Sequence, residues 1–223
     1  MDERQADLDR AVRGGADSDF LVQRAEEHFA RGQWEKAVTA YTQADERGPC
    51  SLAAWHHHAL VRLKLDDTEG YRKLCATPLE RLDRTSPKPN LGVAINVAWV
   101  CALGPDAVGD YARLVALAEL VVSEAPDPVK HALLNTLGAI LYRAGQYKEA
   151  VARLNEGIAL DKGEASMQDF LFLAMAQHRL GETGEARKTL ARIVPPRPDQ
   201  GQPWENLELE LLGREARALI EGK

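Results

Sequence analysis

The 223-residue chain has few cysteines and none in a metal or redox spacing. Cys50, Cys75 and Cys101 are an odd number, and no two of them form a Cys-x-x-Cys pair. This usage is typical of free thiols in a reducing compartment. We therefore expect a cytoplasmic protein without a disulfide framework.

The chain also lacks long apolar runs and an excess of basic residues. No apolar run approaches the roughly 18 residues that a membrane span needs. The N-terminus, Met1-Asp2-Glu3-Arg4, is charged where a signal peptide would be apolar. The formal net charge is -6 and no basic stripe is visible, which argues against nucleic acid as the main partner. We predict neither a nucleic-acid-binding protein nor a membrane protein.

No arrangement of a nucleophile and a base is legible, so we predict no enzyme, no catalytic residue and no cofactor. Gly181-Glu182-Thr183-Gly184 resembles a phosphate loop only superficially, because it lacks the following Lys-Ser/Thr.

Three consecutive histidines, His56-His57-His58, form the most conspicuous polar cluster. Two histidines that share a metal ion on one helix need a spacing of three or four residues. Consecutive residues point about 100° apart, so these three cannot share one ion. We predict a structural role and no metal site. Cys50 and Cys75 keep the metal alternative open.

The stretch from Pro128 to Leu160 predicts two antiparallel helices joined by a tight turn. We expect Asp127 to cap the first helix and Ala144-Gly145 to end it, since glycine tolerates the left-handed conformation of a C-terminal cap. Small residues, Gly138 and Ala150, stand where bulk would hold the helices apart. Apolar residues recur at three and four in both helices: Leu134, Leu137, Leu141, Tyr147, Val151, Leu154 and Ile158.

These residues resemble the tetratricopeptide-repeat family, whose 34-residue signature includes Leu-Gly, Gly-x-Tyr and a later alanine. Leu137-Gly138, Gly145, Tyr147 and Ala150 fall at matching places. An earlier stretch matches more closely, at Gly32, Trp34, Ala37, Tyr41, Ala44 and Pro49. One such pair buries too little apolar surface to stand alone and must stack on neighbours. The resemblance therefore implies an all-α fold, a right-handed α-solenoid of about five antiparallel helix pairs.

The spacing of the signature gives the expected organisation. We assign residues 1–17 to a flexible tail or linker remnant and residues 18–200 to the repeat superhelix. Its units are placed at 18–51, 52–86, 90–127, 128–163 and 166–198. The third unit is degenerate, with extra residues in the loop around 106–110. Pro78 predicts a kink or an early end in the second unit.

Residues 201–223 predict a final amphipathic helix with Pro203 in its first turn. It resembles the capping helix that seals the open end of a repeat stack. A dimerisation seam is the alternative, and we favour a monomer.

The order of the whole chain is also similar to the repeat regions that follow bacterial serine/threonine kinase domains and WD40 domains. Asn96-Val97-Ala98-Trp99 and Tyr142-Arg143-Ala144-Gly145 carry this finer resemblance. No kinase motif is present in the sequence.

In this family the first helix of each pair lines a concave groove that binds a partner peptide. Asparagine amides in the groove can bond a peptide backbone, and Arg143 and Arg179 can pair with a carboxylate. Tyr142 and Phe172 have packing between repeats as an equal alternative. Val22 and Glu26 stand where the carboxylate-clamp variant has lysine and asparagine, so that mode of binding is not expected. The matching groove positions are His56, Leu60, Lys64, Asn96, Asn135, Ala139, Tyr142, Arg143, Phe172, Met175, His178 and Arg179.

The sequence therefore predicts a protein–protein interaction module that binds a partner peptide or segment in its groove. The alternative is a regulatory or structural appendage of a larger signalling protein, which docks on a neighbouring domain or dimerises through the last helix.

Overall fold

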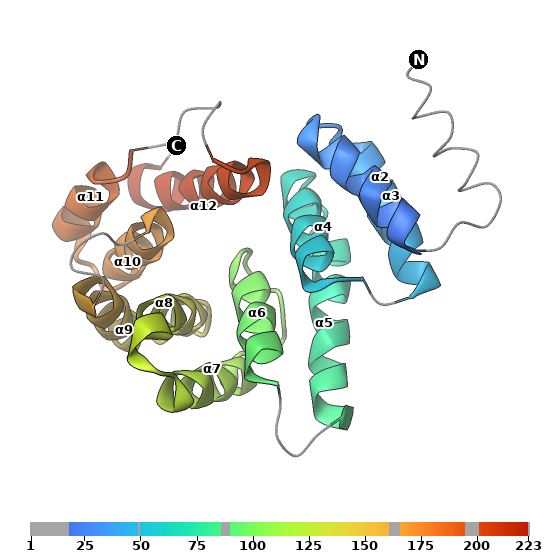
Figure 1. The fold of residues 1–223 in the computed structure, drawn as a ribbon. Helices are drawn as coiled ribbons and strands as arrows, with labels where there is room; N and C mark the ends of the chain where they lie inside the picture. The colour runs from blue at the N-terminus through green and yellow to red at the C-terminus, as the bar shows by residue number, and fades with distance from the viewer. Residues whose placement is uncertain (1–17, 49, 86–89, 161–165, 195–200, 223) are drawn as a thin grey trace. The chain divides into compact units, whose positions relative to one another are not determined.

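The computed structural model describes residues 18–48, 50–85, 90–160, 166–194 and 201–222. These residues form eleven helices and no strand, so the expected all-α fold of the solenoid type is confirmed (Figure 1). The chain divides into two compact units, Met1–Tyr71 and Arg72–Lys223, which we call unit 1 and unit 2. The predicted tail, residues 1–17, lies outside the described part of the chain.

Unit 1 contains one complete helix pair and the helix that follows it. Its helices are α2 (Ser18–Ala30), α3 (Trp34–Arg47), α4 (Leu52–Lys64) and the start of α5 (Thr68–Thr85). Gly32 makes the turn between α2 and α3 with a φ of +66°, which glycine adopts without strain. The interior of the pair is formed by Leu21, Ala25, Phe29, Ala37, Tyr41 and Ala44, all buried.

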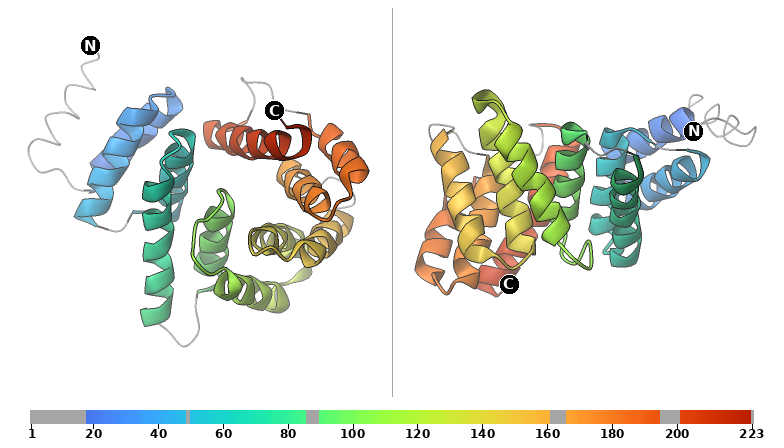
Figure 2. Two further views of the ribbon diagram at one scale, coloured as in Figure 1. Left: turned by 180° about the vertical axis from the view of Figure 1, so that it is seen from behind. Right: turned by 90° about the horizontal axis from the view of Figure 1, so that it is seen from below.

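Unit 2 contains the end of α5 and seven further helices: α6 (Leu91–Ala102), α7 (Ala112–Glu124), α8 (Asp127–Arg143), α9 (Tyr147–Leu160), α10 (Met167–Arg179), α11 (Thr183–Ala191) and α12 (Pro203–Glu221). The first helices of successive pairs, α6, α8 and α10, are neighbours in series. They lie on the inner side of a curve, and α7, α9 and α11 lie on its outer side (Figures 1 and 2). Helix α12 packs against α10 and α11.

Helices α8 and α9 approach closely at Gly138, as the sequence predicts. A Cβ atom added to Gly138 would lie 2.5 Å from Cγ of Leu154. No side chain fits at that distance, so glycine sets the spacing of this pair. Gly145 then turns the chain between the helices with a φ of +76°.

The loop of the third helix pair is enlarged, as expected. Helix α6 ends at Ala102 and α7 begins at Ala112. Arg72 of α5 donates from Nε to the Asp106 carbonyl at 2.9 Å, and the Ala107 amide donates to the Tyr111 hydroxyl at 2.9 Å. These bonds give the longer connection a defined path.

Two local predictions are wrong. Asp127 does not cap α8, because the helix already begins at Asp127 and Pro126 is its N-cap with extended backbone. The Asp127 carboxylate instead lies in the first turn, where the helix dipole favours a negative charge. Helix α5 continues past Pro78 to Thr85, so the early end is wrong and the alternative, a kink at Pro78, stays a prediction. A proline removes a single amide donor from a helix, and that loss does not by itself end one.

Among the helices that the structure describes, none is both long and apolar enough to cross a lipid bilayer.

Candidate functional site

Two carboxylates of helix α12 accept hydrogen bonds from α6, α8 and α10, the first helices of the three pairs of unit 2. Glu208 is 2% exposed and accepts hydrogen bonds from Trp99 Nε1 of α6 at 3.2 Å and Gln168 Nε2 of α10 at 2.9 Å. Glu215 stands seven residues later, about two turns along the same face of the helix. It is paired with Arg143 of α8. We call these donors, Trp99, Arg143 and Gln168, the α12 clamp.

Arg143 is the centre of the clamp and is almost completely enclosed, with its side chain 4% exposed. Its Nη1 and Nη2 donate to the two carboxylate oxygens of Glu215, the second at 2.7 Å. Its Nε donates to the Ala102 carbonyl at 2.7 Å, and Nη2 also reaches the Leu103 carbonyl at 3.4 Å. The planar fork of arginine suits a carboxylate held by two parallel bonds. The guanidinium thus joins α8 to the end of α6 and to α12.

Aromatic rings form the floor beneath this guanidinium. The Arg143 guanidinium carbon lies 5.3 Å from the ring centre of Tyr142 and 5.6 Å from that of Phe172. Phe172 meets Trp99 and Tyr142 edge to face, with ring centres 6.0 and 5.9 Å apart. Burial and the Glu215 carboxylate raise the pKa of Tyr142, while Arg143 and a hydrogen bond with Arg179 oppose that rise. The Tyr142 and Phe172 rings are therefore uncharged beside the guanidinium, and the face of a neutral aromatic ring attracts a cation.

Half of the predicted groove residues are placed in the interior. Leu60, Ala139, Phe172 and Met175 are completely buried, and Asn135 and Tyr142 are nearly so. A side chain without exposed surface packs against its own chain and cannot contact a partner unless its neighbours move. The accessible members of the predicted set are exposed Asn96 and Arg179 and the partly buried His56, Lys64 and His178.

Asn135 joins one helix pair to the next. Its Nδ2 donates to Asp169 Oδ1 at 2.6 Å and to Ser166 Oγ at 3.3 Å. Ser166 and Asp169 form the capping box of α10, in which each side chain bonds the other residue's backbone amide. Asn135 therefore stabilises the start of the following helix and does not face outward.

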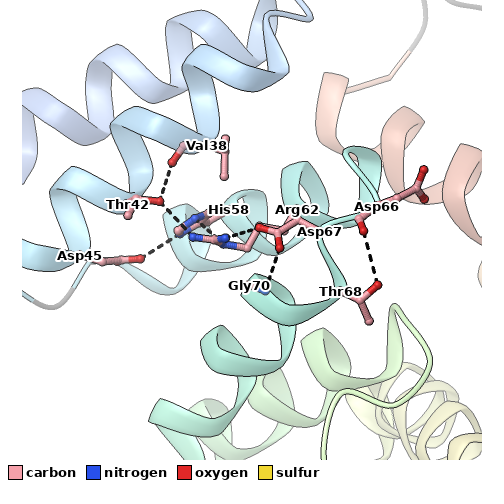
Figure 3. Close-up of polar contacts among 9 residues, drawn as sticks. All are labelled: Val38, Thr42, Asp45, His58, Arg62, Asp66, Asp67, Thr68 and Gly70. Atoms are coloured by element: carbon pink, nitrogen blue, oxygen red, sulfur yellow. Dashed lines mark hydrogen bonds and ion pairs between the residues drawn. The ribbon is translucent and has the colours of Figure 1, made fainter.

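In unit 1, His58 of the histidine cluster belongs to a polar network (Figure 3). His58 is 2% exposed; its Nδ1 lies 2.9 Å from Asp45 Oδ2, and its Nε2 accepts from Arg62 Nε at 2.9 Å. Because Nε2 accepts, the neutral ring carries its proton on Nδ1 and donates it to Asp45. Arg62 continues the network to Asp67 and, at 3.0 Å, to the Thr42 hydroxyl. Burial lowers the pKa of His58 from its ordinary 6.5, so the ring is neutral near pH 7.

His57 engages a different carboxylate from that of His58. His57 Nδ1 lies 2.8 Å from Glu26, which also accepts from the Tyr41 hydroxyl at 2.8 Å. His57 and His58 thus engage different carboxylates, as their 100° separation requires. In the described ranges, no group of three or more histidine, cysteine, aspartate or glutamate side chains could hold a metal ion. The remaining groove position of α4, Lys64, has its ammonium 6.0 Å from the Trp34 ring centre.

Glu208, Glu215, Gln168 and Trp99 are not among the binding residues that the sequence predicts. A signal for Glu208 was present, because it stands beside Leu207, Leu211 and Leu212 on the inward face of an amphipathic helix. A carboxylate on an apolar face is costly unless it is paired. The pattern does not reveal which donors pair with it.

Comparisons with known proteins agree with this fold. Two tetratricopeptide-repeat family models match the chain, one at residues 18–63 and one at residues 141–211. No curated protein matches it. A solved Rap protein, complexed with Competence and Sporulation Factor, superposes with a TM-score of 0.52 at 14% identity, covering 92% of this chain and 64% of that one.

A structure of nearly identical TPR-like repeats of the kinesin light chain type, from Podosopora anserina, gives a TM-score of 0.51. It is 18% identical and covers 91% of this chain and 95% of that one. At such identities the likeness concerns the fold. The two family matches, together with the helix pairs, support tetratricopeptide repeats at residues 18–63 and 141–211 of this chain.

Proposed function

We propose that the chain is a protein–protein interaction module that holds a segment of a partner protein against the first helices of its repeats and catalyses no reaction. Tetratricopeptide-repeat domains are generally non-catalytic scaffolds for protein binding. The observation that carries the proposal is the pairing of Arg143 with Glu215, because it shows the inner side of unit 2 binding a helix through its carboxylate. The Rap protein of similar fold, solved with Competence and Sporulation Factor, supports the same reading.

The accessible first-helix residues of unit 2 supply the contacts for such a segment. Asn96 of α6 and Arg179 of α10 are exposed. The amide of Asn96 can bond a peptide backbone, although its Nδ2 donates to the Gly92 carbonyl at 2.7 Å in the free chain. Arg179 can pair with a carboxylate of the partner.

Affinity capture from the native cell, followed by quantitative mass spectrometry, tests this surface. We expect a chain carrying Asn96→Ala and Arg179→Ala to retain at least tenfold less of each specific partner than the wild type. Arg187→Ala is the matched control, because Arg187 is an exposed arginine on the outer helix α11. Equal capture by all three chains would remove this surface from consideration.

A second candidate is the regulatory appendage that docks on a neighbouring domain of a larger signalling protein, such as a kinase or WD40 protein. Exposed apolar side chains favour it: Leu120, Val129 and Leu160 of unit 2 are 39%, 48% and 50% exposed. Apolar side chains left in water mark surfaces that other proteins cover.

Light scattering of the wild type and of Leu120→Glu with Leu160→Glu separates self-association from docking. If the wild type and the double variant are both monomers, the chain does not dimerise through these side chains.

A further inference from the structure

We propose that the inner side of unit 2 accepts an acidic amphipathic helix of a partner protein in exchange for α12, so that α12 is a competitor built into the chain. This inference rests on the proposed function and specifies its partner. The helix must present two carboxylates seven residues apart beside leucines, as α12 does with Glu208 and Glu215.

The contacts of α12 with the clamp depend on side chains that any such helix could supply. Glu208 and Glu215 meet donors from three different helices, α6, α8 and α10. Two carboxylates removed from water contribute little net stability, because their desolvation offsets much of the attraction. They instead select for a carboxylate at each of two places. The α12 clamp therefore recognises two carboxylates at a fixed spacing on a helix, whether or not that helix belongs to the same chain.

Helix α12 is also a self-sufficient helix. Gln202 and Glu205 form a capping box at its start, Pro203 occupies its first turn, and Gly222 ends it with a φ of +71°. Its outward side carries exposed charged residues, Glu210, Arg214 and Arg217. The helix therefore satisfies its own ends and remains amphipathic when it leaves the clamp.

Apolar packing holds α12 along its length. Leu207, Leu211 and Leu212 are buried beside the clamp. Near the C-terminal end, Ile220 and Leu219 pack against Ala174, Ala186 and Leu190 of α10 and α11. An incoming helix must therefore bury leucines where Leu207, Leu211 and Leu212 of α12 are buried. The incoming helix would occupy the places of Glu208 and Glu215.

Because α12 is tethered to its binding place, a partner helix must bind more tightly than α12 to displace it. A short tether gives α12 an effective concentration in the millimolar range. A second copy of this chain offers the same α12 with no gain in affinity, so it displaces the tethered helix poorly. A partner helix with additional contacts can displace it, which is why we assign the occupant to a partner protein.

A fluorescein-labelled peptide of residues 201–223 is the probe for such a helix, and its binding to the full chain is measured by fluorescence anisotropy. The chain is either wild type or carries Glu208→Gln with Glu215→Gln, which loosens its own α12. We expect the peptide to bind the double variant at least tenfold more tightly than the wild type. A peptide carrying the same two glutamines should bind at least tenfold more weakly than the parent peptide.

Two matched controls accompany this measurement. A peptide with Glu210→Gln, changed on the outward side, should bind like the parent. Adding Arg143→Met to the double variant should abolish binding. Circular dichroism shows whether each chain is folded, and Glu208→Gln alone replaces the double variant if that chain does not fold.

Three results would overturn the inference: no peptide binding to a folded variant chain, equal binding by the glutamine peptide, or a dimer of the wild type at micromolar concentration in light scattering. The proposed function fails separately, since its capture experiment changes Asn96 and Arg179 and leaves the α12 clamp intact.

Discussion

Arg143 donates to both carboxylate oxygens of Glu215, a residue 72 positions later in the chain. The same guanidinium bonds the carbonyls at the end of α6, so one side chain connects α6, α8 and α12. The sequence predicts that Arg143 can pair with a carboxylate of a partner, and in the structure it is paired with a carboxylate of its own chain. This relationship fixes the last helix to the inner side of unit 2.

Replacing Arg143 with methionine should destabilise unit 2. The change leaves Glu215 and the Ala102 carbonyl without their donor, and breaking a buried pair is strongly destabilising. Since Glu215 remains 27% exposed, we expect a loss of about 2 kcal/mol in the free energy of unfolding. Urea unfolding followed by tryptophan fluorescence measures it.

The control is Arg153→Met, which breaks an arginine–glutamate pair on the surface of α9. Exposed pairs contribute less than about 0.5 kcal/mol, so this variant should unfold like the wild type. Similar losses in both variants would show that Arg143 has no special place in the fold.

Adding a methyl group at Gly138 should separate α8 from α9. Gly138→Ala places a Cβ atom 2.5 Å from Leu154 Cγ, and we expect overpacking to cost about 1–3 kcal/mol. In contrast, Gly184 of α11 has open space around it, and Gly184→Ala should stabilise the chain by about 0.5 kcal/mol. Thermal unfolding of the two variants should therefore shift in opposite directions, and a stabilised Gly138→Ala chain would contradict the observed packing.

Asn135→Ala should reduce stability and not only partner binding. The substitution removes the amide that bonds Asp169 and Ser166 at the start of α10, with an expected cost of about 1–2 kcal/mol. Asn155→Ala is the control, because Asn155 is exposed on α9. Chemical denaturation that shows no difference between the two variants would return Asn135 to the set of groove residues.

Unit 1 should lose stability as the pH falls from 8 to 5.5. The unfolded His58 binds a proton near its ordinary pKa of 6.5, whereas the pKa of the folded residue is lowered by burial. The unfolded state therefore binds more protons across this range, and stability rises with pH. Asp45, Arg62 and Asp67 are the charged groups that face the ring.

Thermal unfolding at several pH values measures this dependence. His58→Gln should unfold at a more constant temperature across the range than the wild type. His56→Gln, from the same histidine cluster, should keep the wild-type dependence. An unchanged slope in His58→Gln would assign the pH dependence to other groups.

The repeat architecture could be predicted from the sequence because it depends on short-range patterns. Gly138, Ala150 and Gly145 specify a close helix pair and its turn within about twenty residues of chain, and apolar spacing specifies which face is buried. Two local features could not be predicted from such patterns. Helix α8 begins at Asp127 after Pro126, and α5 continues past Pro78 to Thr85, although a proline inside a helix removes one amide donor.

Sequence alone determined the helix pairs and their order. Only the tertiary structure decided that Arg143 is paired with Glu215, that Glu208 meets Trp99 and Gln168, and that Phe172 and Met175 are buried. The physical reason is distance along the chain. Helix formation depends on residues three and four apart, whereas a pairing over 72 or 109 positions depends on where every intervening helix has packed.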